Sequence, residues 1–324
     1  MLFNRRMHEM KFVTTCGLIL AIRLGEDEVM SRIDLNFGSL EERDRQYNAR
    51  QSVPDFDACI ERYRQSAQAV RATSNVLLDI QYGQGAAERL DIYLPDNPTA
   101  PVPVLVFIHG GYWRAQRKEE ACIMAPTFNA AGIAVCCIEY TLMPEAHMSE
   151  IIRETRSAIS WLYQHGASLG LDPERIHVSG SSAGGQLVGV LLEDTWQARY
   201  NVPQDTIKGA LALSGLFDLQ PLCGTIVNEW MQLTPDQAAK YSPLMHIPDQ
   251  APPILLAVGG LETDGFKRQT EAYLRALTAK GLRVEVIAAP QCNHFDLLCE
   301  LESPASEMSQ RLLNQITQAG FPHP

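Results

Sequence analysis

Short, uninterrupted apolar runs recur along the chain and alternate with amphipathic stretches. An apolar run without polar interruption is typical of a strand buried on both faces, as in a parallel sheet. Such strands are predicted at residues 104–108, 133–138, 176–178, 210–213, 254–258 and 284–288. Helical periodicity predicts helices at residues 118–131, 148–165, 266–279 and 306–318. This alternation predicts right-handed crossovers and a mostly parallel sheet, an α/β fold.

The segment before these elements has a different pattern. Two strands are predicted at residues 75–82 and 88–94, and Gly83-Gln84-Gly85 between them suggests an antiparallel hairpin. Residues 38–72 are polar and helix-prone, with apolar side chains spaced loosely for one face. We therefore expect a helical arm within residues 30–72, lying over one domain that spans residues 73–324.

Residues 1–29 fit neither part. Basic residues precede a mostly apolar run over residues 12–22, as in the first two regions of a signal peptide. No small-residue cleavage site follows, and Arg23 ends the run too early for a membrane span. Because Met30 opens a segment like a normal cytosolic start, we expect residues 1–29 to be a non-native upstream extension, or a disordered one.

Composition, charge and cysteine content limit the class of protein and its expected partners. The 324 residues are 46% hydrophobic and 20% charged, as in ordinary globular domains. The net charge of −11 disfavours binding to nucleic acid or to anionic membranes. The eight cysteines form no C-x-x-C pair, so reduced thiols in a cytoplasmic protein are expected. A homodimer is compatible with the sequence, which does not fix an oligomeric state.

The most informative stretch is residues 176–187, where a short strand leads into Gly180-Ser181-Ser182-Ala183-Gly184 and then into an apolar helix pattern. Strand, sharp turn and helix are the context in which G-x-S-x-G forms a nucleophile elbow. The pentapeptide alone is a modest signal, matched by chance in roughly one such chain in ten. Its flanking elements strengthen it, and they make Ser182 the candidate nucleophile.

A serine nucleophile needs a base and a group that orients the base. In an elbow fold these follow the serine in the order acid, histidine, each on a loop after a strand. His294 follows the predicted strand at residues 284–288, and Glu262 and Asp264 follow the one at residues 254–258. Glu262 is favoured as the acid because it is closer to the strand end. Asp264 is the alternative, and it could instead cap the next helix.

The loop His109-Gly110-Gly111 directly follows the buried strand at residues 104–108. Glycines there let the backbone approach a substrate, so the N–H groups of Gly111 and Tyr112 are expected to form an oxyanion hole with that of Ala183. His109 is expected to hydrogen-bond within its own loop.

Aromatic residues flank these candidates. Tyr112, Trp113 and Phe295 are expected to line an aromatic-friendly substrate pocket, with core packing an equal alternative for Trp113. Cys292 is close enough to His294 to be a second candidate nucleophile, but packing beside the site is favoured. The sequence has no H-E-x-x-H motif or Cys/His cluster, so neither a metal nor a cofactor is expected.

These motifs resemble a known family. Residues 180–184 with His109-Gly110-Gly111 resemble the hormone-sensitive-lipase side of the α/β-hydrolases. With Tyr112-Trp113 added, the loop resembles that of arylformamidases, or kynurenine formamidases, and their bacterial esterase relatives. The resemblance runs from about Leu40 to the C-terminal helix. It implies an α/β-hydrolase fold with helices on both faces of the sheet, and Ser182, His294 and Glu262 as nucleophile, base and acid.

Two departures from the formamidase pattern affect the substrate. Glu262 stands where those formamidases carry Asp, although Glu serves in other α/β-hydrolases. Formamidases more often carry His before the elbow serine and a small residue and His after it. Ser181, Gly185 and Gln186 occupy those positions here, which makes the elbow closer to that of general esterases.

The predicted reaction is therefore acyl transfer from a small ester or amide to water through an acyl-enzyme on Ser182. A carboxylesterase for short acyl or aryl esters and an arylformamidase remain equal alternatives, because the sequence does not show the pocket shape. A non-catalytic binding module on the same scaffold is the alternative of a different class. Such modules typically lose the serine or the histidine, and this chain has both.

Overall fold

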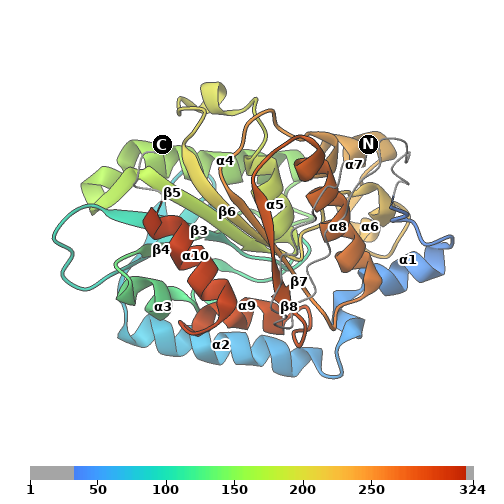
Figure 1. Cartoon of the computed structure of the whole chain (residues 1–324), viewed down its shortest axis with the longest axis horizontal. Coiled ribbons are helices and arrows are strands. Elements are labelled where there is room, and N and C mark those ends of the chain that lie inside the picture. The colour runs from blue at the N-terminus through green and yellow to red at the C-terminus, as the bar shows by residue number, and fades with distance from the viewer. Residues whose placement is uncertain (1–32, 319–324) are drawn as a thin grey trace, which may run out of the picture. The chain divides into compact units, whose positions relative to one another are not determined.

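The computed structural model describes residues 33–318. The expected extension over residues 1–29, and the start of the arm at residue 30, lie outside the described residues. Within them, eight strands form one sheet in the order β1-β2-β4-β3-β5-β6-β7-β8 (Figure 1). The strands are β1 (Asn75–Gln81), β2 (Arg89–Leu94), β3 (Val102–Ile108), β4 (Ala134–Ile138), β5 (Leu171–Ser181), β6 (Ile207–Leu213), β7 (Ile254–Gly259) and β8 (Val284–Ala289).

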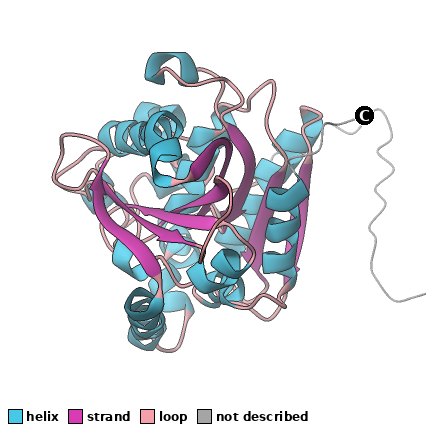
Figure 2. Ribbon diagram, turned by 90° about the vertical axis from the view of Figure 1, so that its left-hand side faces the viewer, coloured by secondary structure: helices cyan, strands magenta, loops and turns pink. Residues whose placement is uncertain are grey.

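One strand of the sheet, β2, runs opposite to the other seven. β2 pairs antiparallel with both β1 and β4, while every pairing from β4 through β3, β5, β6 and β7 to β8 is parallel. Helices lie on both sides of the sheet (Figure 2). Both faces of the central strands are therefore covered, which explains why β3 and β4 are apolar throughout. The predicted fold class is confirmed.

The helices that follow the first strands are α3 (Ala125–Ala130), α4 (Met148–His165), α5 (Ala183–Leu191), α6 (Asn228–Met231), α7 (Pro235–Lys240), α8 (Asp264–Ala279), α9 (Asp296–Cys299) and α10 (Glu307–Gln318). Of these, α4, α5, α8 and α10 agree with the predicted helices, whereas α6, α7 and α9 were not predicted. Between residues 33 and 318, no helix is long and apolar enough to cross a membrane.

The helix predicted over residues 118–131 is wrong in extent. The structure has a 3-10 turn at Lys118–Glu120 and then the short helix α3. Proline cannot supply a backbone N–H, so Pro126 suits the first turn of a helix rather than its interior. Lys118 is also buried, with Nζ 2.8 Å from Asp91 Oδ1, so a charged residue occupies a position that helical periodicity would leave on the surface.

Two helices precede the sheet where the arm is expected, α1 (Leu40–Tyr47) and α2 (Phe56–Thr73). The Ser39 and Asp55 side chains accept backbone N–H groups at the two helix starts, as N-caps do. The buried side of α2 is a stripe at helical spacing, formed by Ile60, Tyr63, Ala67 and Val70. This stripe holds the arm against the rest of the chain.

Candidate active site

Ser182 occupies the turn between β5 and α5. Its φ of +57° and ψ of −115° belong to a region that non-glycine residues rarely adopt. Its N–H donates to the Leu213 carbonyl at the end of β6, with the two atoms 2.8 Å apart. The serine is therefore held in a strained turn at the carboxyl end of the central strands, as a nucleophile elbow requires.

Glycines let the neighbouring backbone close in on this turn. A Cβ on Gly184 would lie 2.0 Å from the Ile108 carbonyl oxygen, at the end of β3. A Cβ on Gly110 would lie 2.8 Å from the Ser181 oxygen and 3.3 Å from Ser182 Cβ. No larger residue fits either position unless the backbone shifts, so the glycine loop after β3 packs directly against the elbow.

His294 and Glu262 meet at the ends of the last two strands. His294 Nδ1 lies 2.6 Å from Glu262 Oε2, and both side chains are buried. Since a carboxylate only accepts, Nδ1 donates, and Nε2 is left as the basic nitrogen of the ring. Asp264 is instead the first residue of α8, where Thr263 is the N-cap. The structure thus brings Glu262, and not Asp264, to His294.

The second oxygen of Glu262 is also held. Glu262 Oε1 accepts from Ser214 Oγ at 2.5 Å and from the Gly259 N–H at 2.7 Å. Sequence reasoning did not find Ser214, because a single serine after a strand has no distinguishing motif. Its position directly after β6, beside the strands that supply the elbow and the acid, was the available signal.

Ser182 and His294 line the same cavity, whose volume is about 460 Å³. Its other walls are mostly aromatic and aliphatic, which suits a small apolar or aromatic group. The arm supplies Tyr47, Ala49, Phe56, Ile60 and Tyr63, and later parts of the chain supply Ile226, Val227, Trp230, Phe295 and Leu298. Sequence analysis placed the arm over the domain but did not assign it to the pocket.

Of the three residues predicted to line the pocket, two do so and one does not. Tyr112 and Phe295 line the cavity, and the Tyr112 hydroxyl donates to the Tyr47 carbonyl of the arm. Trp113 is fully buried, and its indole N–H donates to Gln186 Oε1 on α5 at 3.1 Å. Of the two alternatives for Trp113, the structure therefore shows core packing and not a place in the cavity wall, because a buried indole N–H needs a partner and Gln186 supplies it beneath the loop.

The predicted oxyanion donors lie around the elbow. Left-handed backbone at Gly111 (φ +90°) and Tyr112 (φ +50°) turns the loop, and the N–H groups of Arg114 and Ala115 both donate to the Gly111 carbonyl. Ala183 is the first residue of α5, and the first N–H groups of a helix have no partner within it. Ala183 and the turned loop can thus offer backbone donors beside Ser182.

His109 is tied to a carboxylate that sequence reasoning missed. Its Nε2 lies 2.9 Å from Glu139 Oε1, its Nδ1 lies 3.0 Å from the Gly110 carbonyl, and its ring stacks on Tyr140. Burial is the largest single influence and acts to raise the pKa of Glu139, but the hydrogen bond and charge of His109, together with two backbone N–H donors, lower that pKa below its usual value. This buried contact fixes the loop and points to a structural role for His109.

The arm is joined to both loops that carry Glu262 and His294. The Tyr63 hydroxyl donates to the Phe295 carbonyl at 2.6 Å, next to His294. Thr263 Oγ1 donates to the Gln46 carbonyl at 2.5 Å, next to Glu262. The arm therefore stabilises the positions of two loops that come from the far end of the chain.

Cys292 is a buried thiol, and its burial, followed by nearby carboxylates, raises its pKa to about 11. A thiol in that environment is a poor nucleophile near neutral pH, which favours packing. In the part of the chain that the structure describes, the cysteines are free, and no cluster of three His, Cys, Asp or Glu residues could hold a metal ion.

Sheet, elbow and loop order together define the class of protein, an α/β-hydrolase of the esterase type. The chain is similar over 85% of its length to the structure of a putative thioesterase from Silicibacter sp. TM1040, with 28% identity, 99% of that chain covered and a TM-score of 0.72. An esterase from Pyrobaculum calidifontis shares the fold at 20% identity, with a TM-score of 0.62 over 87% of this chain and 97% of that one.

The chain belongs to the BD-FAE family, whose model matches residues 90–269. A kynurenine formamidase of Salmo salar is 30% identical over 293 residues, which cover 87% of this chain and 97% of that one. A probable isoprenylcysteine alpha-carbonyl methylesterase of Arabidopsis thaliana is 27% identical over 68% of this chain and 51% of its own length.

The protein is thus a hydrolase of small-molecule esters or amides, and the predicted esterase and arylformamidase-like class is confirmed. These relatives are named as hydrolases, so none of them supports the binding-module alternative.

Proposed function

We propose that the protein hydrolyses its substrate through an acyl-enzyme on Ser182, with His294 as base and Glu262 as the acid that orients it. The observation that carries this proposal is the shared cavity. Ser182 stands there in a strained elbow, beside a histidine whose Nδ1 is 2.6 Å from a buried carboxylate. Backbone N–H groups of Gly111, Tyr112 and Ala183 would hold the oxyanion, and water would then release the acyl group.

For the substrate, we infer an N-formyl amide of an aromatic amine that also carries a carboxylate. Trp230, Phe295 and Tyr112 provide aromatic walls for such a ring, and a formyl group is the smallest acyl group to fit beside the elbow. The identity with kynurenine formamidases over most of both chains supports the same substrate class.

Two arginines that line the cavity support the inference that the substrate carries a carboxylate. Arg114 and Arg117 line it, and neither forms an ion pair with any residue from 33 to 318, although the chain as a whole carries a net charge of −11. The Arg114 guanidinium lies 4.2 Å from the centre of the Trp230 ring, which leaves its N–H groups available at the ring edge. An anionic substituent would find its partners there.

Gln186 differs from the residue that formamidases more often carry at this position of the elbow, but this difference does not argue against a formamide substrate. Gln186 is fully buried, accepts from Trp113 and donates to the Tyr241 carbonyl at 2.9 Å. It therefore supports the glycine loop from below, and the residue type at this position sets loop packing rather than substrate contact.

Kinetics on N-formylkynurenine, p-nitrophenyl acetate and p-nitrophenyl butyrate would test both levels of the proposal. We expect fast deformylation that is lost in Ser182→Ala. Hydrolysis of the two esters alone, lost in the same variant, would make the protein a carboxylesterase. Activity that survives Ser182→Ala would refute the catalytic assignment.

The anionic subsite has its own test. In Arg114→Gln and Arg117→Gln, KM for N-formylkynurenine should rise about ten-fold while the kinetics on neutral p-nitrophenyl acetate stay unchanged. Arg275→Gln, on the exposed side of α8, is the matched control. An equal loss on both substrates would mean that the arginines support the fold rather than bind a carboxylate.

A further inference from the structure

Ser214 lies between the two halves of the active site. It directly follows β6, the strand between β5 and β7, and it is fully buried. Its φ of +47° is in the left-handed region, which L residues rarely adopt. Its N–H donates to the Ala257 carbonyl of β7 at 2.8 Å, so the turn is anchored to the strand that leads to the acid.

The end of β6 contacts both the nucleophile and the acid. The Leu213 carbonyl accepts the Ser182 N–H at 2.8 Å, and the next residue, Ser214, donates from Oγ to Glu262 Oε1 at 2.5 Å. Two consecutive residues therefore set the position of the elbow and of the carboxylate relative to one another.

The donors on Glu262 determine which way its carboxylate faces. Ser214 Oγ and the Gly259 N–H both bind Oε1, and this leaves Oε2 for His294 at 2.6 Å. A glutamate has one more rotatable bond than an aspartate, so more side-chain freedom must be removed to keep it aligned. Two donors on one oxygen fix both the position and the plane of the carboxylate.

We propose that Ser214 is a positioning residue of the hydrolase, which holds Glu262 so that Oε2 faces His294. The inference rests on the proposed serine mechanism. Ser214 is not among the residues that line the cavity in the described part of the chain, so it acts through Glu262 and not on the substrate.

The test compares Ser214→Ala with Ser214→Gly. Both variants remove the hydroxyl, but glycine accepts a φ of +47° without strain and alanine does not. If the hydroxyl is what matters, both variants lower kcat by about ten-fold or more, with KM within about two-fold of the wild type. If only the backbone conformation matters, Ser214→Gly keeps the wild-type kcat, and the proposal is wrong.

A spectroscopic readout separates positioning from a general loss of structure. The His294 Nδ1 proton, shared with Glu262, should give a downfield proton resonance that shifts or broadens in both Ser214 variants. Ser179→Ala is the matched control, because Ser179 is also a buried serine, on β5, and its hydroxyl has no hydrogen-bond partner within residues 33–318. It should keep both kcat and the resonance.

The outcomes also separate this inference from the function on which it rests. Loss of activity in Ser182→Ala together with wild-type kcat in both Ser214 variants would overturn the role of Ser214 alone. Activity that survives Ser182→Ala would overturn the serine mechanism, and the positioning role with it.

Discussion

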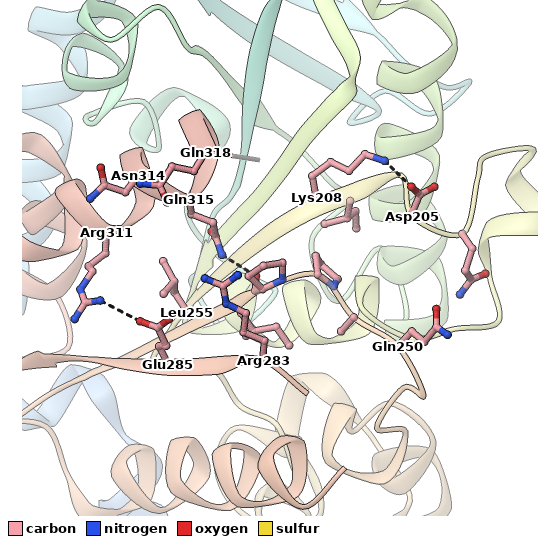
Figure 3. A pocket seen from close by; sticks show the side chains of 16 residues that line it. Asp205, Lys208, Gln250, Leu255, Arg283, Glu285, Arg311, Asn314, Gln315 and Gln318 are labelled. Atoms are coloured by element: carbon pink, nitrogen blue, oxygen red, sulfur yellow. Dashed lines mark hydrogen bonds and ion pairs between the residues drawn. The ribbon is translucent and has the colours of Figure 1, made fainter. Parts of the chain in front are cut away.

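The two ends of strands β6, β7 and β8 carry similar residue types but are organised differently. At the carboxyl end, Ser214, Glu262 and His294 join in buried hydrogen bonds next to a cavity of about 460 Å³. At the amino end lies a larger pocket, of about 860 Å³, beside α10 (Figure 3). Charged side chains also line that pocket, but they do not converge.

At the amino end, four of the five charged residues that line the pocket within residues 33–318 form two separate pairs. Lys208 Nζ lies 2.8 Å from Asp205 Oδ2, and Arg311 Nη1 lies 3.0 Å from Glu285 Oε2 (Figure 3). Exposed pairs of this kind contribute little free energy. The comparison teaches that cavity volume does not locate chemistry in this molecule, whereas the convergence of buried, hydrogen-bonded groups does.

Two histidines show the same contrast inside the protein. His294 is buried with a carboxylate on one nitrogen. His177, on β5, is fully buried, and neither of its ring nitrogens has a hydrogen-bond partner among the described residues. Burial, with lesser contributions from Arg175 and Lys208, lowers the pKa of His177 to about 3. His294 is thus held by a carboxylate beside the cavity, whereas burial keeps His177 neutral.

The largest expected effect is at the carboxyl end. Ser182→Ala should reduce kcat by about 10⁵- to 10⁶-fold, because the residual rate would come from binding and the oxyanion donors alone. Steady-state kinetics on N-formylkynurenine would measure this loss, with circular dichroism to show that the variant is folded.

The next largest effect is expected from a comparison of two glutamates, one at each end of the strands. Glu262→Gln should lower kcat by about 10³- to 10⁴-fold, since an amide cannot orient the histidine and stabilise its cation as a carboxylate does. Glu285→Gln, at the pocket in Figure 3, is the matched control and should leave kcat unchanged. Comparable losses in both would contradict the distinction between the two ends.

His177 predicts a dependence of stability on pH. The unfolded chain binds a proton at this residue below about pH 6.5, but the folded protein does so only below about pH 3. Stability should therefore fall as the pH drops through this window, by about 1.4 kcal/mol per pH unit from this residue alone.

His177→Leu should remove that contribution, so the free energies of unfolding at pH 7 and pH 4.5 should lie closer together than in the wild type. Urea titrations at both values would measure the difference. The exposed His246→Gln is the control. An unchanged difference in His177→Leu would mean that His177 is protonated in the folded state.

The smallest effect belongs to the amino-end pocket. Arg311→Gln breaks the exposed pair with Glu285 and should change the free energy of unfolding by no more than about 0.5 kcal/mol, with no change in kcat. A loss of activity in this variant would show that the pocket is coupled to the active site.

The sequence predicted those parts of the molecule that have a local pattern. Uninterrupted apolar runs identified the buried strands, and the parallel order followed from their alternation with helices. The elbow motif and the loops after the last strands singled out Ser182, Glu262 and His294, which the structure places at one edge of the sheet.

What could not be predicted depends on side-chain direction and on long-range contacts. Ser214 has no motif of its own, and its importance comes from lying between two parallel strands. The sequence left Trp113 between the pocket wall and the core, because the direction of its side chain depends on a partner on α5. The role of the arm as a cavity wall requires contacts between distant parts of the sequence, which no periodicity within the arm encodes.

The hydrogen bond from Tyr63 to the Phe295 carbonyl joins residues 232 positions apart. A ribosome makes the arm early and the histidine loop late, and a contact of such sequence separation forms only after both have emerged. The part of the cavity wall formed by the arm is therefore synthesised long before the part formed by the loop at Phe295, and the cavity is complete only when both are present. Under the proposed mechanism, the nascent chain gains activity only after β8 has joined the sheet and brought His294 to the cavity.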